Sequence, residues 1–151
     1  MNFQKASMTE RSGYRGYIGS RPYMGDRAPQ HVQNLVIRDY CQRNGLTYLL
    51  SATEYAMEDC YVMLEEVLRE IDTIEGIVMY SIFMLPESQA RRNRVMGRIL
   101  EAGASVHFAL ENLSVTSDTD AQKADDILKI NHLMQTAGTF DRTAIDLSQM
   151  P

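Results

Sequence analysis

Polar and charged residues follow each apolar run of this sequence, and their types could support ligand binding or catalysis. The segment after "YRGYIG" contains Ser20, Arg21, Asp26 and Arg27. Arginine binds carboxylate or phosphate through paired hydrogen bonds, and the start of a following helix favours an anion. We therefore expect the turn to hold an anion through Ser20, Arg21 and Arg27. Nucleophilic attack by Ser20 is the alternative.

The later apolar runs are followed by carboxylates and another serine. Glu54 or Glu111 could act as a general base where it is partly desolvated. The alternative is that these are ordinary loop residues, because Ser51 and Glu54 have the spacing of a helix capping box. The predicted ligand-binding set consists of Ser20, Arg21, Arg27, Glu54, Ser81 and Glu111.

The apolar runs read as short strands that alternate with amphipathic helices. We expect strands in "YRGYIG", "LTYLLS", "GIVMYSIF" and "SVHFALENL". The third is apolar almost throughout, which is typical of a strand buried on both faces of a parallel sheet. Four alternations of strand and helix predict a three-layer α/β fold with a mostly parallel, four-stranded sheet flanked by helices. In such a sheet, ligands bind beyond the carboxyl ends of the strands.

Proline and glycine residues indicate where the helices between these strands begin and end. Pro29 suits the first turn of a helix that Gly45 closes, and Pro86 suits the start of another that ends at Gly103. The first helix is expected to bury Val32, Leu35, Val36 and Tyr40. A helix after Glu54 is expected to place Cys60, Tyr61, Leu64, Val67, Leu68 and Ile71 on one side, and Ser117, Asp118 and Asp120 prepare the last helix. Residues 1–12 are predicted as a flexible leader, 13–135 as one domain and 136–151 as a C-terminal tail.

Composition narrows the function classes. The net charge of −5 argues against a nucleic-acid binder, yet residues 1–30 hold five basic residues against two acidic ones, which favours an anionic ligand there. Cys41 and Cys60 lie in apolar helical patterns and are expected to be buried thiols of a cytoplasmic protein. No metal site is expected, because the three histidines have no ligand spacing, and no cofactor is expected. No apolar run is long enough to span a membrane.

Two further clusters have structural and functional interpretations. Tyr14, Tyr17 and Tyr23 could stack on a sugar or base, although at least one should belong to the core. "ARRNRVMGR" places Arg91, Arg94 and Arg98 on one helical face. This face is either a solvated surface or a contact for an anionic partner.

The order of these segments resembles the catalytic domain of serine recombinases (resolvases). The likeness spans roughly residues 14–113 and includes "NLVIRDYCQRNGLTY", "EGIVMYSIFMLPE" and "ILEAGASVHFALENL". It implies a resolvase-like fold, with Ser20 near the position of the nucleophile. The family has an Asp-Arg pair and a second Arg after the third strand, where this chain has Phe83, Met84 and Glu87. The resemblance therefore does not extend to DNA strand exchange.

The sequence also resembles a small bacterial family, the sporadic carbohydrate cluster proteins. The shared segments are "GYIGSRPYMGDRAPQHVQNLVIRDYCQRNGL", "EGIVMYSIFMLPE" and "HFALENL". This resemblance implies a role in synthesis of surface polysaccharide or lipopolysaccharide, with carbohydrate-biosynthesis enzymes as partners. It assigns no reaction to any residue.

Two hypotheses about function follow. In the first, a cytoplasmic protein binds or modifies an anionic sugar precursor, such as a nucleotide sugar, in the crevice. In the second, the chain is a non-catalytic accessory or regulatory subunit with a degenerate serine-recombinase-like fold. A homodimer is compatible with either hypothesis.

Overall fold

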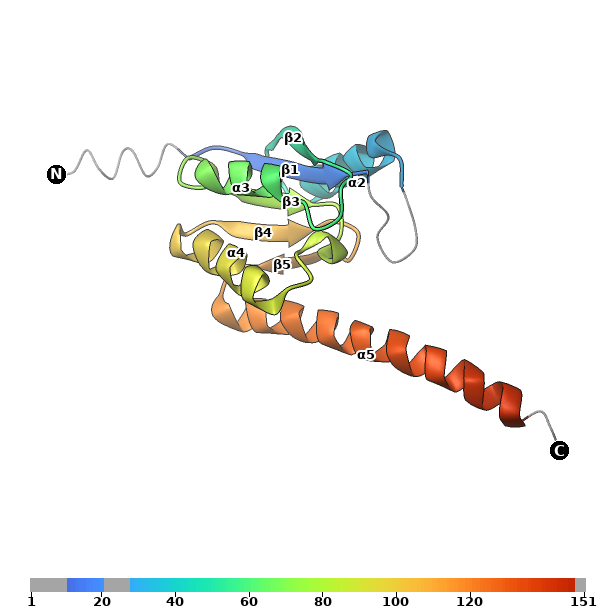
Figure 1. Cartoon of the computed structure of the whole chain (residues 1–151). Helices are drawn as coiled ribbons and strands as arrows, with labels where there is room; N and C mark the ends of the chain where they lie inside the picture. Colours follow the sequence, from blue (N-terminus) through green and yellow to red (C-terminus); the bar gives the residue numbers. More distant parts are fainter. Residues whose placement is uncertain (1–10, 21–27, 149–151) are drawn as a thin grey trace.

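The structure, a computed structural model, describes residues 11–20 and 28–148, with side chains as far as residue 137. It is an α/β fold, as predicted (Figure 1). Its elements in chain order are β1 (Tyr14–Gly19), α2 (Gln30–Arg43), β2 (Tyr48–Glu54), α3 (Val62–Arg69), β3 (Gly76–Met79), the 3-10 helix η1 (Ile82–Met84), α4 (Gln89–Glu101), β4 (Ser105–Phe108), β5 (Leu113–Val115) and α5 (Asp118–Ser148).

The central sheet has five strands in the order β2-β1-β3-β4-β5, one more than the four predicted. The first four are parallel, and β5 pairs antiparallel with β4. The expected strand in "SVHFALENL" is in fact β4, a tight turn and the start of β5. Asn112 in this turn has a φ of 57°, a left-handed conformation that asparagine tolerates and that lets the chain reverse. The short hairpin was therefore misread as one strand.

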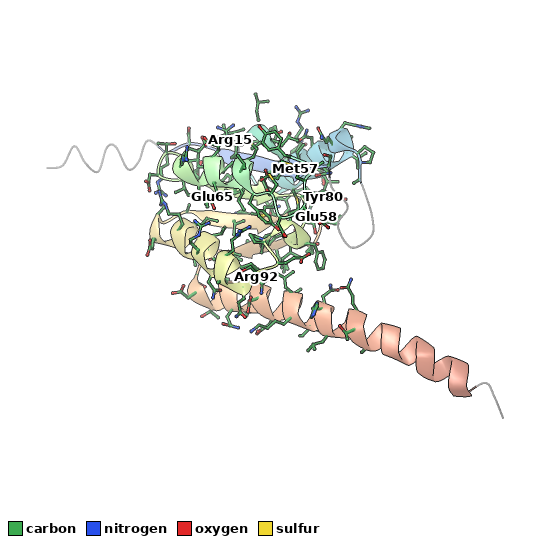
Figure 2. The ribbon with its side chains drawn as sticks, viewed as in Figure 1. Arg15, Met57, Glu58, Glu65, Tyr80 and Arg92 are labelled. Carbon is green, nitrogen blue, oxygen red and sulfur yellow. The ribbon has the colours of Figure 1, made fainter. Side chains whose placement is uncertain are left out.

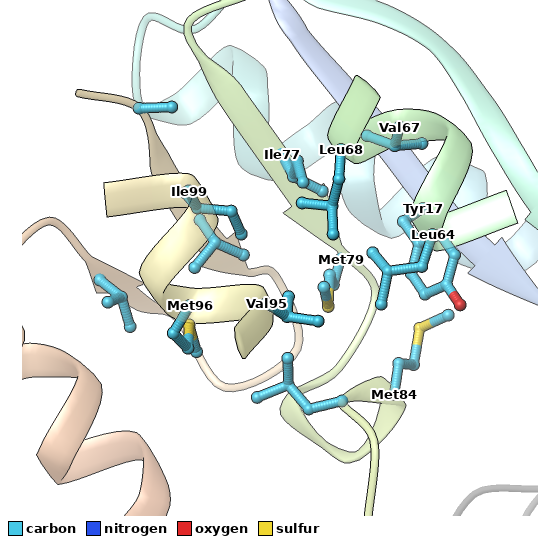
Figure 3. Close-up of a cluster of buried hydrophobic side chains, with 14 of the residues drawn as sticks. Tyr17, Leu64, Val67, Leu68, Ile77, Met79, Met84, Val95, Met96 and Ile99 are labelled. Atoms are coloured by element: carbon cyan, nitrogen blue, oxygen red, sulfur yellow. The ribbon is translucent and has the colours of Figure 1, made fainter. Parts of the chain in front are cut away.

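Helices cover both faces of the sheet, because successive strand residues point to opposite sides. On one face, Ile18 of β1 and Val78 of β3 pack with Ile37, Tyr40 and Cys41 of α2. On the other, larger face, the core unites the sheet with α3 and α4, and Figure 3 shows its labelled members around Met79. Its fully buried members include Tyr17, Leu64, Ile77, Val95, Ile99 and Phe108. The predicted three-layer arrangement is confirmed.

The buried face of α2 includes Tyr40, as predicted, and Val36 packs against the same core, but the rest of the predicted stripe differs. Gln33, Ile37, Tyr40 and Cys41 are the buried residues of this helix, whereas Leu35 is 59% exposed. The sequence favoured the face with more apolar residues, because the polar residue Gln33 interrupts the face that is actually buried. Gly45, with a φ of 68°, follows the helix as expected.

The starts of two helices also differ from expectation. Helix α4 begins at Gln89, with the Ser88 hydroxyl accepting a hydrogen bond from the Arg91 amide, rather than at Pro86. The chain does not extend the strand after β3: Tyr80 and Ser81 lead into the 3-10 helix η1. Pro86 is buried between η1 and α4 and separates the two helices.

Helix α5 continues to Ser148, through most of the segment expected as a tail, and it extends away from the sheet (Figure 1). None of the helices in the described part of the chain is long and apolar enough to cross a membrane. Cys41 and Cys60 are buried and form no disulfide, as predicted.

Candidate functional site

The candidate site lies where the strand order reverses. Strand β1 lies between β2 and β3, and the helices that follow β1 and β2 cover opposite faces of the sheet. Ligands of open α/β sheets bind beyond the strand ends at such a point. Figure 2 shows Met57, Glu58 and Tyr80, which follow β2 and β3, toward this end of the molecule.

Ser20 lies directly after β1 and is partly buried. The preceding residue is held by Gln33 of α2, whose side-chain oxygen accepts from the Gly19 amide at 3.1 Å. The Gln33 nitrogen donates to the carbonyls of Gly19 at 2.6 Å and Ala28 at 2.8 Å. One buried side chain therefore fixes both residues 19 and 28, at either end of the predicted anion-binding turn. Arg21 and Arg27 lie outside the described residues.

The role of Gln33 was missed in the sequence. It is 1% exposed, and buried amides need hydrogen-bond partners. The available signal was a glutamine four residues before Ile37, on what proves to be the apolar face of α2. Such an interruption predicts a buried polar contact, here with the end of β1.

Glu54 ends β2 and is 2% exposed. Its carboxylate accepts from the Tyr17 hydroxyl at 2.7 Å and from the backbone amides of Met63 and Leu64 at 3.1 Å each. It also accepts from its neighbour's amide, Tyr55, at 3.2 Å. The two amides of α3 belong to the first turn, whose N–H groups have no partner within the helix. Glu54 therefore caps α3, although the helix begins eight residues later in the sequence. Its carboxylate oxygens are occupied by hydrogen bonds that hold the fold together.

The Ser51–Glu54 capping box was wrong. Both residues lie in β2, and the next helix begins eight residues later, at Val62. The Ser51 hydroxyl donates to Asn34 of α2 at 2.6 Å. The spacing matched the motif by coincidence, although Glu54 does cap a helix.

Ser81 and Glu111 come together at the ends of β3 and β4. The buried Ser81 hydroxyl donates to one oxygen of Glu111 at 2.8 Å, and the Ile82 amide donates to the other oxygen at 2.8 Å. Ser81 also accepts from the Phe83 amide and so caps η1. The predicted neighbours are thus in contact, and Glu111 fixes the backbone after β3.

The tyrosine cluster is divided between the two faces of the sheet. Tyr17 is fully buried, and its hydroxyl donates a hydrogen bond to Glu54. Tyr14 begins β1, at the opposite end of the strand from Ser20, and its ring packs edge-on against His107 with centroids 5.2 Å apart. Both belong to the packed structure, and Tyr23 lies outside the described residues.

His107 forms a second polar cluster, on the face that α2 covers. Its Nδ1 shares a hydrogen bond of 2.7 Å with the Tyr40 hydroxyl, and its Nε2 shares one of 3.1 Å with the Ser105 hydroxyl. Burial lowers the pKa of His107, because desolvation disfavours the imidazolium. Burial likewise raises the pKa of Tyr40. These contacts join β4 to α2 and do not involve the residues that follow the carboxyl ends of the strands.

The arginine face of α4 is occupied by contacts with α3 and with the residues that flank it. Arg94 pairs with Glu65 of α3, and Arg98 pairs with Asp72 at 3.2 Å. The Arg91 guanidinium lies 5.3 Å from the centre of the Tyr61 ring. The solvated-surface interpretation therefore fits better than a contact for an anionic partner.

Two surface grooves formed by described residues lie away from the strand ends. One, of about 460 Å³, lies between β2 and α3 and is lined by Arg15, Leu50, Ser51, Ala52, Met63, Glu66, Val67, Arg69 and Glu70. The other, of about 310 Å³, lies between α4 and α5, beside the buried Arg92–Asp125 ion pair. Hydrogen bonds from Arg92 and Lys129 outweigh the opposing effect of burial and lower the pKa of Asp125. No group of three or more metal-binding side chains occurs in the described ranges.

Comparisons with known proteins support the fold. The chain is similar to the N-terminal catalytic domain of TP901-1 integrase, with a TM-score of 0.58 and 12% identity over 82% of this chain and 98% of that one. It is also similar to a resolvase family site-specific recombinase from Streptococcus pneumoniae, with a TM-score of 0.55 and 9% identity over 87% and 98% of the two chains. No protein-family description and no curated protein sequence matches. The fold is therefore that of resolvase-type catalytic domains, and at these identities the likeness concerns the fold alone.

Proposed function

We propose that this chain binds an anionic sugar precursor, a sugar phosphate or nucleotide sugar, beyond the ends of β1 and β3. Its setting would be cytoplasmic synthesis of bacterial surface carbohydrate, as the resemblance to sporadic carbohydrate cluster proteins implies. The main support is the position of Ser20 at the end of β1, where the strand order reverses. Arg21 and Arg27 follow in the sequence and supply the positive charge that such a ligand requires.

Binding is favoured over chemical modification by the engagement of the two carboxylates. A general base must reach the proton that it removes. Glu54 receives hydrogen bonds from three backbone amides and a hydroxyl, and Glu111 receives one from an amide and one from a hydroxyl. Both carboxylates hold the chain segments at the ends of β2, β3 and β4. In this proposal they shape the binding site, and Ser20 holds the anion instead of attacking it.

The proposal is tested by thermal denaturation with glucose 1-phosphate, UDP-glucose and neutral glucose. A ligand at about 100 times its Kd adds about 2.7 kcal/mol of stability, which raises the Tm of a domain this size by roughly 5–10 °C. We expect a rise with one of the anions, none with glucose, and loss of the effect in Arg21→Ala/Arg27→Ala. Arg69→Ala, on the exposed side of α3, is the matched control. Binding by the double variant at wild-type affinity would contradict the proposed site.

An accessory subunit is the second candidate. Three large apolar side chains around the loop between β2 and α3, Tyr55, Met57 and Val62, are each more than half exposed. Exposed apolar clusters favour contact with another protein. We expect Met57→Lys to abolish co-purification with a carbohydrate-biosynthesis enzyme encoded beside this protein, while ligand-induced thermal shifts persist. Unchanged co-purification would argue against this surface.

A further inference from the structure

A serine, a histidine and a tyrosine on the α2 face of the sheet form a chain of hydrogen bonds that the proposed function does not use. The Ser105 hydroxyl lies 3.1 Å from Nε2 of His107, and Nδ1 of the same ring lies 2.7 Å from the Tyr40 hydroxyl. Nucleophilic catalysis uses a hydroxyl within hydrogen-bond reach of a base, with the base oriented by a third group. The three side chains have these contacts.

The hydrogen bond between Ser105 and His107 connects no separate parts of the fold. Both residues belong to β4 and are two positions apart, so their side chains lie on the same face of the sheet. The bond between Tyr40 and His107, in contrast, holds α2 against β4. A structural role therefore accounts for the contact with the tyrosine, but not for the contact with the serine.

Ser105 and His107 are only partly buried, because the core under α2 does not reach the far edge of the sheet. That core includes residues of β1 and β3 and the residue after β4, but no described residue of β5. In Figure 1, α2 lies beside β1, whereas β5 forms the opposite edge of the sheet. The neighbour of His107 on β5 is the exposed Ser114. A small molecule can therefore reach the Ser105 hydroxyl.

His107 is suited to accept a proton at neutral pH. Burial lowers its pKa, so the imidazole is neutral there. With its hydrogen on Nδ1, the ring donates to the Tyr40 oxygen and leaves the lone pair of Nε2 facing Ser105. Tyr40 is 4% exposed, so water does not compete for this orienting contact.

Tyr14 bounds the space beside the serine. Gly76 of β3 lies between Tyr14 and Ser105 in the register of the sheet, and a Cβ atom on Gly76 would lie 2.9 Å from the Tyr14 ring. The same ring packs edge-on against His107. Its hydroxyl has no hydrogen-bond partner among the described residues, so it can donate to a substrate oxygen. This ring limits the site to a small acyl group.

We propose that Ser105 is a nucleophile that takes the acyl group of a small carboxylic ester, a reaction separate from anion binding at the strand ends. The Ser105 Oγ bonds to the ester carbonyl carbon while its proton passes to Nε2 of His107. The bond from this carbon to the leaving oxygen then breaks, and the leaving alcohol takes the proton from Nε2. Water attacks the acyl-serine in the same way, which releases the carboxylic acid and restores the hydroxyl. Tyr40 is a positioning residue.

The test is labelling of the full chain with a fluorophosphonate, which bonds to activated serines with loss of fluoride, followed by peptide mapping by mass spectrometry. We expect an adduct at Ser105 that forms at least about a hundredfold faster than any at Ser114, because a positioned base contributes about 10²- to 10⁴-fold. Ser105→Ala should lose both this adduct and the hydrolysis of p-nitrophenyl acetate. The matched control Ser114→Ala, at the exposed serine of β5, should keep both.

Variants of the other two residues test the activation of the serine. His107→Gln should slow labelling by at least about a hundredfold, and Tyr40→Phe, which keeps the ring, by about tenfold. Circular dichroism identifies a variant that fails to fold, in which case the other variant and the wild-type comparison of Ser105 with Ser114 decide. Ser105→Ala should leave any ligand-induced thermal shift intact, so the proposed anion site is tested separately.

Three results would overturn the proposal. The first is a folded wild-type chain without an adduct at Ser105. The second is equally fast labelling of Ser114, which would mean that Ser105 has no special reactivity. The third is a labelling rate that the folded variants of His107 and Tyr40 leave unchanged, because the hydrogen-bonded chain would then be structural only.

Discussion

Replacing Glu54 by alanine should destabilise the fold strongly, because this side chain satisfies several buried donors at once. The substitution removes the acceptor of the Tyr17 hydroxyl and of the Met63 and Leu64 amides. Loss of a helix cap costs about 1 kcal/mol, and a buried donor left without a partner costs about 1–3 kcal/mol. Partial relaxation of the loop recovers some of this. We expect a loss of about 3–4 kcal/mol, or roughly 10 °C in Tm.

The assay is equilibrium unfolding in urea, followed by far-ultraviolet circular dichroism. The midpoint should fall with little change in the m-value, since the folded state buries the same surface. Glu54→Gln keeps one acceptor oxygen and should lose about 1–2 kcal/mol. Glu66→Ala is the control on the exposed side of α3, where a surface ion pair contributes at most about 1 kcal/mol.

The same variants separate a structural role of Glu54 from a catalytic one. A general base that is not needed for folding can be replaced by glutamine with loss of turnover and unchanged stability. The structural role predicts that stability falls in the order wild type, Glu54→Gln, Glu54→Ala. A loss below about 0.5 kcal/mol in Glu54→Ala would refute the reasoning, because it would mean that the amides of α3 find other partners at no cost.

Three other perturbations have definite expected outcomes. Gly76→Ala should prevent stable folding, because the added methyl group would overlap a carbonyl oxygen of the neighbouring strand. Gly97→Ala, in open space on α4, should instead raise the free energy of unfolding by about 0.5–1 kcal/mol. Thermal unfolding of both variants checks these outcomes. Because burial lowers the pKa of His107, the unfolded state binds more protons, so its contribution to stability is present above about pH 6.5 and is lost as pH falls through the folded-state pKa. Urea titrations from pH 4 to 8 should show this loss in the wild type and a smaller one in His107→Gln. Arg92→Ala should cost about 3–5 kcal/mol in urea unfolding, because it leaves the carboxylate of Asp125 buried without its main partner.

Local patterns were sufficient to predict most of the fold. Every residue of "GIVM" in β3 is buried, as expected of an interior parallel strand. Gly45 and Gly103 follow α2 and α4 with φ values of 68° and 76°, the conformation for which glycine is preferred after a helix. These predictions held because each depends on a few neighbouring residues.

The errors arose where distant residues decide the structure. Glu54 caps a helix that begins eight residues later, so its role depends on the path of the chain between them. Gln33 is buried because the end of β1 lies beside it, and the pattern of α2 shows only that a polar residue interrupts the apolar face, not which segment it contacts. The hairpin between β4 and β5 depends on the left-handed conformation of a single asparagine, Asn112. Short-range signals are ambiguous at such positions.

The engagement of Glu54 and Glu111 limits what the proposed site could recognise. The oxygens of Glu54 and Glu111 accept hydrogen bonds from amides at the starts of α3 and η1 and from hydroxyls, while Gln33 fixes the backbone at residues 19 and 28. A rigid frame lowers the entropic cost of ordering a ligand. It also leaves selectivity to groups that the frame presents, and among the predicted residues the cationic ones are Arg21 and Arg27. If the site binds a sugar precursor, its affinity should therefore depend on the anionic group far more than on the sugar.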